Sequence, residues 1–403
     1  MIKNLDKKIR AYALRNAIHY EGKANSGSVV SALFNEGLEK EEVKEIMPKI
    51  QKAIEEISKF SSEQREKEFE KLKEFVSERE RREGLPELPN VPKTGVVMRF
   101  AQAASGPMHL GHALTGMPNS LYVKKYGGKF YIRIEDTNPD KVFKDCYKGF
   151  KEDCDWLFGN VAEYIVQSDR IDLYYRYAVA LIEKKSAYVC TCSQESFKKF
   201  SNEMKECPCR KKSVKENILS WEKMLDKKGY REGEAVLRFK SNMKHPNPAM
   251  RDFPLARICE KEHPKQKKKH KVWPLMNLSV TIDDIEYGMT HIIRAKEHLD
   301  NAKRQKMIYE SLGFKSKFPW TFFMGRYKFT DVPLSKRKIV AAIESGEYEG
   351  WDDLRLPTLK ALKKKGYKPE TFAKFAELRG LTEVDKVIDS KEIFRILNEL
   401  NKD

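Results

Sequence analysis

Apolar residues at helical spacing dominate the first part of the chain, from Asp6 to about Glu83. They are Ile9, Leu14, Ala17 and Ile18, followed by Val43, Ile46, Ile50, Ile54 and Ile57. Three prolines then fall between Gly84 and Pro92, where they exclude a helix or a central strand. We therefore predict an N-terminal helical region with a Pro-rich linker over residues 1–92.

Strand and helix patterns alternate over residues 93–189. A short buried strand is expected at Val96 to Phe100 and another at Lys129 to Glu135, with a long helix running through Trp156. Such alternation is typical of a parallel sheet with crossover helices. The predicted class is α/β, with residues 93–189 forming the first half of a Rossmann-like nucleotide-binding core.

The alternation stops at residues 190–264, which we expect to form an insertion with a helix around Trp221 and a strand from Ala235 to Lys240. The second half of the core is predicted over residues 265–330, with a helix from Lys296 to Leu312. Residues 331–403 are expected to hold a basic loop, a helix starting near Ile339, and further short amphipathic helices.

Seven cysteines, an odd number, argue against a disulfide framework. Four of them form two CxC pairs, at Cys190 and Cys192 and at Cys207 and Cys209. Thiolates at this spacing can close a tetrahedral structural Zn²⁺ site, because four protein ligands leave no open position for chemistry. The alternative is four unbound thiols. Cys146, Cys154 and Cys259 are expected to be small core residues.

Basic residues outnumber acidic ones by 78 − 60 = 18. Such an excess attracts a polyanion, so nucleic acid is the expected partner, although a heavily charged solvated surface would give the same composition. No apolar stretch reaches membrane-spanning length and the N-terminus lacks an apolar signal segment. The expectation is a soluble, cytoplasmic protein without membrane contact.

The segment from Met98 to Ala113 reads as a strand, a Gly/Pro turn and a helix opening at two histidines. His109 and His112 would share one face of that helix, where ring N–H groups and the helix N-terminus could bind a triphosphate. The alternative is that one histidine caps the helix and the other is an ordinary surface residue. Far downstream, Ser335-Lys-Arg-Lys338 is expected to be a mobile basic loop able to reach phosphate.

These two segments resemble the HIGH box and the second signature of class I aminoacyl-tRNA synthetases. Further segments narrow the resemblance to glutamyl-tRNA synthetases of the archaeal/eukaryotic type. They are Arg99-Phe100-Ala101, Ser105-Gly106-Pro107, Arg133-Ile-Glu-Asp-Thr137, Val272-Trp-Pro274, Thr290-His-Ile-Ile-Arg294, Gly350-Trp-Asp-Asp353 and Leu356-Pro-Thr358. The resemblance covers nearly the whole chain.

The resemblance implies ATP-dependent activation of glutamate to glutamyl-adenylate, followed by transfer to the 3′ end of tRNA(Glu). Whether tRNA(Gln) is also a substrate stays open. The implied catalytic residues are His109, His112 and Lys336, acting with Mg²⁺. ATP would contact Gly111, Glu297, Ser335 and Arg337, and the amino acid would contact Arg99, Ser105, Glu135 and Arg294.

The resemblance also assigns roles to whole segments. The insertion would bind the acceptor stem and carry the zinc, and the helices of residues 331–403 would form a stem-contact subdomain. The N-terminal helices are expected to serve docking or tRNA contact.

Three features depart from the family pattern. Gln102-Ala103-Ala104 stands where relatives carry Pro-x-Pro, which is expected to loosen the loop. Met276 replaces an expected tyrosine, and relatives continue beyond the position of Asp403 into anticodon-binding β-barrels. We therefore expect a separate chain to carry those barrels. The alternatives are that this chain is a shortened piece of a longer protein, or that tRNA identity is read without an anticodon module.

Two rival functions remain open at this point. One is a truncated paralogue that makes glutamyl-adenylate and passes glutamate to another acceptor. The other is a catalytically silent tRNA-binding scaffold.

Overall fold

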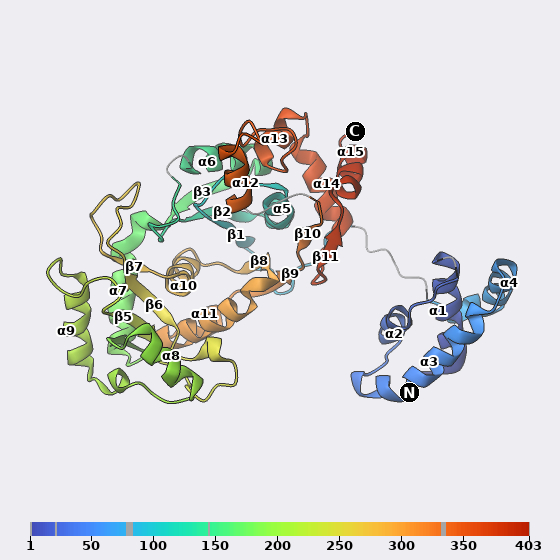
Figure 1. Cartoon of the computed structure of the whole chain (residues 1–403), viewed down its shortest axis with the longest axis horizontal. Coiled ribbons are helices and arrows are strands. Elements are labelled where there is room, and N and C mark those ends of the chain that lie inside the picture. Colours follow the sequence, from blue (N-terminus) through green and yellow to red (C-terminus); the bar gives the residue numbers. More distant parts are fainter. Residues whose placement is uncertain (1, 21, 78–83, 144–145, 332–335, 403) are drawn as a thin grey trace. The chain divides into compact units, whose positions relative to one another are not determined.

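The computed structural model describes residues 2–20, 22–77, 84–143, 146–331 and 336–402, and it divides into two compact units, Met1–Arg81 and Arg82–Asp403 (Figure 1). The first unit is helical, with α1 (Leu5–His19), α2 (Ser26–Phe34), α3 (Val43–Ser58) and α4 (Ser62–Leu72), plus the short turns η1 (Lys40–Glu42) and η2 (Lys73–Phe75). Its own core includes Ile9, Leu14, Ile46 and Ile50, as the helical spacing predicts. Ile18 is instead exposed, because it lies next to buried Ala17 and therefore turns toward another side of α1.

The second unit is built on parallel strands, in agreement with the predicted α/β class. Strands β1 (Val96–Ala103), β2 (Gly128–Glu135) and β3 (Val161–Val166) form one sheet in that order, and β8 (His291–Ala295) pairs in parallel with β9 (Trp320–Met324). The Thr290 N–H donates to the Val97 carbonyl at 3.0 Å, so the second pair lies beside β1. Because β1 and β2 are parallel, their carboxyl ends lie at the same edge of the sheet, where ligands bind in such folds.

Strand β1 extends three residues beyond the predicted end at Phe100. Gln102 and Ala103 pair with Ile134 and Glu135 of β2. This extension is possible because neither residue is a proline, which would lack the N–H that a ladder can use. Without prolines this segment continues as a strand. The prediction of a loosened loop is therefore wrong for Gln102 and Ala103.

Helices α5 (Leu110–Tyr126) and α6 (Cys146–Phe158) pack on the first sheet (Figure 1). Gly116 allows a close approach, because a Cβ there would meet the rings of Phe158 at 2.6 Å and Phe100 at 3.0 Å. The first half of the core ends with η3 (Gln167–Arg170) and α7 (Ile171–Glu183), and the second half contains α10 (Met276–Glu286), η6 (Lys296–His298), α11 (Leu299–Leu312) and η7 (Lys315–Lys317). A carboxylate of α10 reaches the sheet through buried ion pairs described below.

Between the two halves of the core lies a four-stranded antiparallel sheet in the order β4 (Ala187–Cys190), β5 (Val236–Phe239), β6 (Pro254–Ile258) and β7 (Val272–Pro274). Its connections hold α8 (Gln194–Asn202), η4 (Pro208–Lys211), α9 (Val214–Leu225) and η5 (Pro248–Met250). The predicted insertion ended at residue 264, yet the sheet includes residues 272–274. Sequence pattern did not reveal this because β7 is only three residues long and is recruited by pairing with β6.

The last part of the second unit holds α12 (Lys336–Glu344), α13 (Leu359–Lys364), α14 (Pro369–Arg379) and α15 (Ser390–Leu400), with a parallel pair of β10 (Tyr327–Phe329) and β11 (Lys386–Ile388). The helix predicted from near Ile339 begins at Lys336. The basic residues from 336 onward therefore belong to a helix and not to a loop. Among the residues that the structure describes, no helix is long and apolar enough to cross a membrane.

Candidate active site

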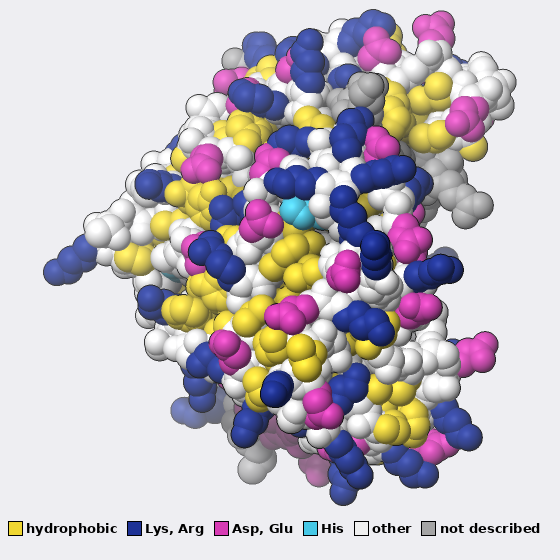
Figure 2. All heavy atoms as spheres, turned by 90° about the vertical axis from the view of Figure 1, so that its left-hand side faces the viewer, with side chains coloured by type: hydrophobic (Ala, Val, Ile, Leu, Met, Phe, Trp, Pro, Cys, Tyr) yellow, Lys and Arg dark blue, Asp and Glu magenta, His cyan; other side chains and the backbone are white. Residues whose placement is uncertain are grey.

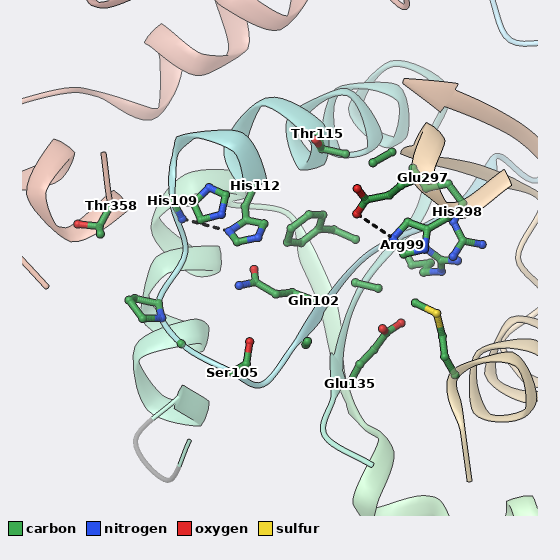
Figure 3. Close-up of a pocket in the computed structure, with 18 of the residues that line it drawn as sticks. Arg99, Gln102, Ser105, His109, His112, Thr115, Glu135, Glu297, His298 and Thr358 are labelled. Carbon is green, nitrogen blue, oxygen red and sulfur yellow. Dashed lines mark hydrogen bonds and ion pairs between the residues drawn. The ribbon is translucent and has the colours of Figure 1, made fainter. Parts of the chain in front are cut away.

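A cavity of about 420 Å³ opens at the carboxyl ends of β1 and β2, beside the start of α5 (Figure 3). It brings together seven of the predicted site residues, which are Arg99, Ser105, His109, His112, Glu135, Arg294 and Glu297. They come from β1, the following turn, α5, β2, β8 and η6. The fold therefore collects on one cavity residues that are far apart along the chain.

For the two histidines, the structure confirms the capping part of the second alternative, while His112 is partly buried and not an ordinary surface residue, and phosphate binding stays a prediction. The helix starts at Leu110, not at the histidines, and His109 is its N-cap. The Gly111 N–H donates to His109 Nδ1 at 3.1 Å, and the His109 N–H donates to His112 Nδ1 at 3.1 Å. The rings are stacked with centroids 3.6 Å apart. Because each Nδ1 accepts, each neutral ring carries its proton on Nε2.

Both histidines are held in the neutral form. Burial lowers the pKa of His109 to about 4, and burial together with the neighbouring His109 ring lowers the pKa of His112 well below its usual value. At neutral pH the pair can therefore offer N–H donors without carrying charge.

The space beside Gly111 is occupied from within the protein. A Cβ at this position would lie 3.0 Å from His109 Cε1, so the capping ring fills the space beside the Gly111 Cα. Gly111 is not among the cavity-lining residues that the structure describes. Its contribution to the site is the backbone N–H that fixes His109.

Arg99 is paired within the protein. It donates two hydrogen bonds to Asp284, at 3.0 and 3.2 Å, and Arg133 donates to the same carboxylate at 2.6 Å. Burial raises the pKa of Asp284, but the two guanidinium groups outweigh burial and bring it down to about 2. Arg133 also pairs with Glu135 at 3.2 Å. Sequence analysis missed Asp284, because nothing local marks which acidic residue will face β1.

Arg294 differs from Arg99 because it forms no ion pair among the described residues. It is 7% exposed, its hydrogen bond within the described part of the chain goes to Gln305 at 2.9 Å, and its Nε is buried without a partner. Among the described residues no carboxylate lies within ion-pair distance of it. Burial, with the nearby Arg99 charge, lowers the pKa of Arg294 to about 9. A buried cation in this state favours an anionic ligand.

The segment after α12 reaches the cavity through backbone hydrogen bonds. Leu110 N–H donates to the Pro357 carbonyl at 2.8 Å, and Leu359 N–H donates to the Met108 carbonyl at 2.9 Å. Further lining residues that sequence analysis did not assign to the site are Gln102, Thr115, His298, Ile339, Trp351 and Thr358. Trp351 and Thr358 lie in segments that resemble the family, so the sequence contained a signal for these two residues. It contained none for His298.

The predicted basic signature is only partly visible. Ser335 lies outside the described residues, and the side chains of Lys336, Arg337 and Lys338 do as well. Ile339, in the first turn of α12, lines the cavity. The backbone of this basic segment therefore begins a helix whose first turn borders the site.

The four paired cysteines meet in one cluster. Sγ atoms of Cys190 and Cys207 are 3.9 Å apart, those of Cys192 and Cys209 are 3.8 Å apart, and all four lie within 4.8 Å of one another. Four sulfurs at about 2.3 Å from a tetrahedral Zn²⁺ would be about 3.8 Å apart, so the donor set and its spacing fit this ion. Cys146, Cys154 and Cys259 are buried elsewhere, as expected.

A second, larger cavity of about 850 Å³ runs along the antiparallel sheet and shares Met276 with the first. Arg238, Arg251 and Arg304 line it, and their hydrogen bonds go to carbonyl or amide oxygens. Within the described part of the chain none of the three forms an ion pair with a carboxylate. These three arginines therefore carry positive charge that no carboxylate among the described residues neutralises in an ion pair. The groove adjoins the cavity with the histidines through Met276.

Comparison with known proteins agrees with this geometry. Residues 95–400 match the family model for tRNA synthetases class I (E and Q), catalytic domain. The fold and the cavity thus define a class I tRNA synthetase.

Individual relatives narrow the family. The chain is 43% identical over 397 residues to a glutamate–tRNA ligase of Methanocaldococcus jannaschii, covering 98% of this chain and 71% of that protein. It is 40% identical to the ligase of Methanobrevibacter smithii, covering 97% and 70% respectively. A solved glutamate tRNA ligase of Elizabethkingia meningosepticum, in complex with its amino acid, has the same fold, with a TM-score of 0.52 at 19% identity over 75% of this chain and 68% of that one. The chain belongs to the glutamate–tRNA ligase family, and the predicted resemblance and the prediction of a ligase are confirmed.

Proposed function

We propose that the chain activates glutamate with ATP to form glutamyl-adenylate and transfers the glutamyl group to the 3′ end of tRNA(Glu). The observation that carries the proposal is the Arg294 guanidinium Nε, which is buried without a partner among the described residues in a cavity that also holds the paired histidines. The glutamate–tRNA ligase names of the relatives support the same reaction.

Glutamate fits the charge of the amino-acid side of the cavity. Arg99, Arg133 and Arg294 contribute three positive charges, and Asp284 and Glu135 contribute two negative ones, so one positive charge is left. Glutamate with its ammonium and two carboxylates carries one net negative charge. We assign one substrate carboxylate to Arg294, the other to Arg99, and the ammonium group to Glu135, and Ser105 stays a proposed contact of the amino acid.

The histidine side of the cavity suits the phosphates. In the proposed step a carboxylate oxygen attacks the α-phosphorus, and the bond to pyrophosphate breaks, so pyrophosphate leaves with the electron pair. The His109 and His112 Nε2–H groups would donate to phosphate oxygens as charge builds there. Mg²⁺ would supply charge neutralisation on the triphosphate when bound.

Further contacts to ATP are proposed from the remaining predicted residues. Lys336, Ser335 and Arg337 are proposed to approach the phosphates, because the first turn of α12 borders the cavity. Gly111 would act indirectly, through the backbone N–H that fixes His109, and Glu297 would contact the ATP ribose.

The tRNA end is proposed to enter through the groove lined by Arg238, Arg251 and Arg304, since phosphates would compensate those charges. Lys and Arg side chains are also spread over the face drawn in Figure 2, with fewer Asp and Glu among them. Cys190, Cys192, Cys207 and Cys209 are proposed to hold a structural Zn²⁺ that keeps this part of the insertion in place.

The relatives are longer than this chain, which covers 71% of the Methanocaldococcus protein. A separate chain with anticodon-binding β-barrels stays a proposed partner, and use of tRNA(Gln) and a cytoplasmic location stay predictions. Two alternatives, a paralogue with another acceptor and a silent tRNA-binding scaffold, are not favoured by the ligase names of relatives at 40–43% identity.

The testing experiment measures attachment of radiolabelled glutamate to total tRNA, alone and with a β-barrel partner added. His109→Asn is the matched control, because asparagine can still cap α5 but removes the imidazole Nε2–H donor. The parent is expected to charge tRNA, and the variant to be slower by about a hundred- to a thousandfold.

Other outcomes separate the alternatives. Glutamate-dependent pyrophosphate exchange without charging of tRNA, even with the partner, would favour the paralogue. Binding of tRNA without any exchange would favour the scaffold. Either result contradicts the proposed function.

A further inference from the structure

Gln102 places an uncharged amide in the cavity at a position where the family resemblance leads one to expect a proline. The side chain is 9% exposed and lines the cavity, and its Oε1 is buried without a hydrogen-bond partner among the described residues. Buried polar atoms are rarely left in this state unless a ligand or another partner satisfies them. The amide therefore points to a ligand contact that the predicted site residues do not include.

The side of the sheet that Gln102 occupies indicates which ligand group it meets. Residues along a strand alternate between faces, so Gln102 shares a face with Phe100, whereas Arg99 is on the other. Phe100 packs edge-on against His112 with ring centroids 6.4 Å apart, and Arg99 turns to Asp284. Figure 3 draws the Gln102 amide in the cavity, apart from the Arg99 side chain. Gln102 thus lies on the histidine side of the cavity, away from Arg99 and Arg133, which bind Asp284.

The backbone holds this amide firmly. Gln102 and Ala103 pair with Ile134 and Glu135, so the side chain projects from a regular strand and not from a loop. Its terminal torsion is broad, which lets either the Nε2 donor or the Oε1 acceptor turn toward a bound group. A nucleotide offers partners for both, since its phosphate oxygens accept and its ribose hydroxyls donate.

We propose that Gln102 binds the nucleotide at the α-phosphate, donating Nε2–H to a phosphate oxygen and accepting from a ribose hydroxyl with Oε1. The inference rests on the proposed function and adds a substrate-binding residue to it. Gln102 transfers no proton in this role. It holds the α-phosphate in line for attack by the substrate carboxylate, a task that depends on geometry.

Two near-isosteric variants test the proposal in the full chain. Gln102→Met fills the same space without polar atoms, and Gln102→Glu replaces the amide with a negative charge. Binding of α,β-methylene ATP is measured by calorimetry without glutamate, and ATP–pyrophosphate exchange is measured with glutamate and total tRNA. Gln102→Met is expected to weaken analogue binding and to lower kcat/KM for ATP by about ten- to a hundredfold, the range for a hydrogen bond to a charged group. Gln102→Glu is expected to lose more because its charge repels phosphate.

KM for glutamate and the thermal midpoint distinguish a ligand contact from a structural role. Both should stay near the parent values in Gln102→Met. Parental analogue binding by both variants would overturn the proposal, as would a loss that affects ATP and glutamate equally and follows a lowered thermal midpoint. If the parent binds the analogue but shows no glutamate-dependent exchange in the presence of total tRNA, the proposed function fails, while the binding data still decide the role of Gln102.

Discussion

Arg294 and Arg133 are two buried arginines with opposite consequences for stability. Arg133 donates to Asp284 and pairs with Glu135, whereas the partner of Arg294 among the described residues is the neutral amide of Gln305. Unpaired buried charge costs folding free energy, so the chain keeps Arg294 at a cost that ligand binding can offset. Such local conflicts are typical of functional sites.

We therefore predict that Arg294→Gln raises KM for glutamate and lowers kcat/KM by roughly thirtyfold or more, because a charge-assisted bond of about 2–3 kcal/mol is lost. KM for ATP should be nearly unchanged, and the thermal midpoint of the unliganded variant should equal or exceed that of the parent. Arg133→Gln is the matched control. It should lower the midpoint strongly, since removing one partner of a buried pair costs about 3–5 kcal/mol. A destabilised Arg294→Gln with normal glutamate kinetics would contradict this assignment.

The neutral histidines predict a dependence of stability on pH. The pKa of His109 falls from 6.5 to about 4 on folding, so the folded state binds fewer protons than the unfolded state between these values. The contribution of His109 to stability is fully present above pH 6.5 and is lost as the pH falls toward 4, by on the order of 3 kcal/mol.

Chemical unfolding of the parent and of His109→Asn at pH 7.5 and pH 5 measures this effect. The variant is expected to lose less free energy of unfolding between the two pH values. Equal losses in both proteins would show that His109 is not held neutral by the fold.

At the scale of elements, the cysteine cluster joins β4 to the turn at η4. Cys190 ends β4, while Cys207 and Cys209 flank the first residue of η4. A metal that bonds both segments would stabilise the fold, because its binding free energy is available only when the ligands are brought together.

We predict that the purified protein carries one Zn²⁺ per chain and that Cys207→Ser or a strong chelator removes it and lowers the thermal midpoint. Elemental analysis and thermal unfolding measure the two effects. Cys259→Ser, which changes a buried cysteine outside the cluster, should retain the metal. Metal content that is unaffected by Cys207→Ser would rule out this ligand set.

At the scale of the whole molecule, the chain has two compact units, each with its own core. The cavity, the cysteine cluster and the arginine-lined groove all belong to the unit of residues 82–403. Within it, Leu110 bonds to Pro357 and Thr290 to Val97, so the sheet edge gathers segments that are far apart in sequence.

Local pattern determined much of this protein. Periodicity predicted the N-terminal helices and the parallel strands, because 3.6- and 2-residue repeats are properties of neighbouring residues. The CxC pairs and the histidine segment indicated a cysteine cluster and a family for the same reason, since their residues are close in sequence.

Tertiary structure alone decided which groups are satisfied and which are left for ligands. Asp284 pairs with Arg99 and Arg133, while Arg294 and Gln102 keep buried atoms without a partner among the described residues. It also recruited β7 to the antiparallel sheet and used the space beside Gly111 for His109. These outcomes depend on long-range contacts and on removal of water, and neither is encoded in the spacing of residues along the chain.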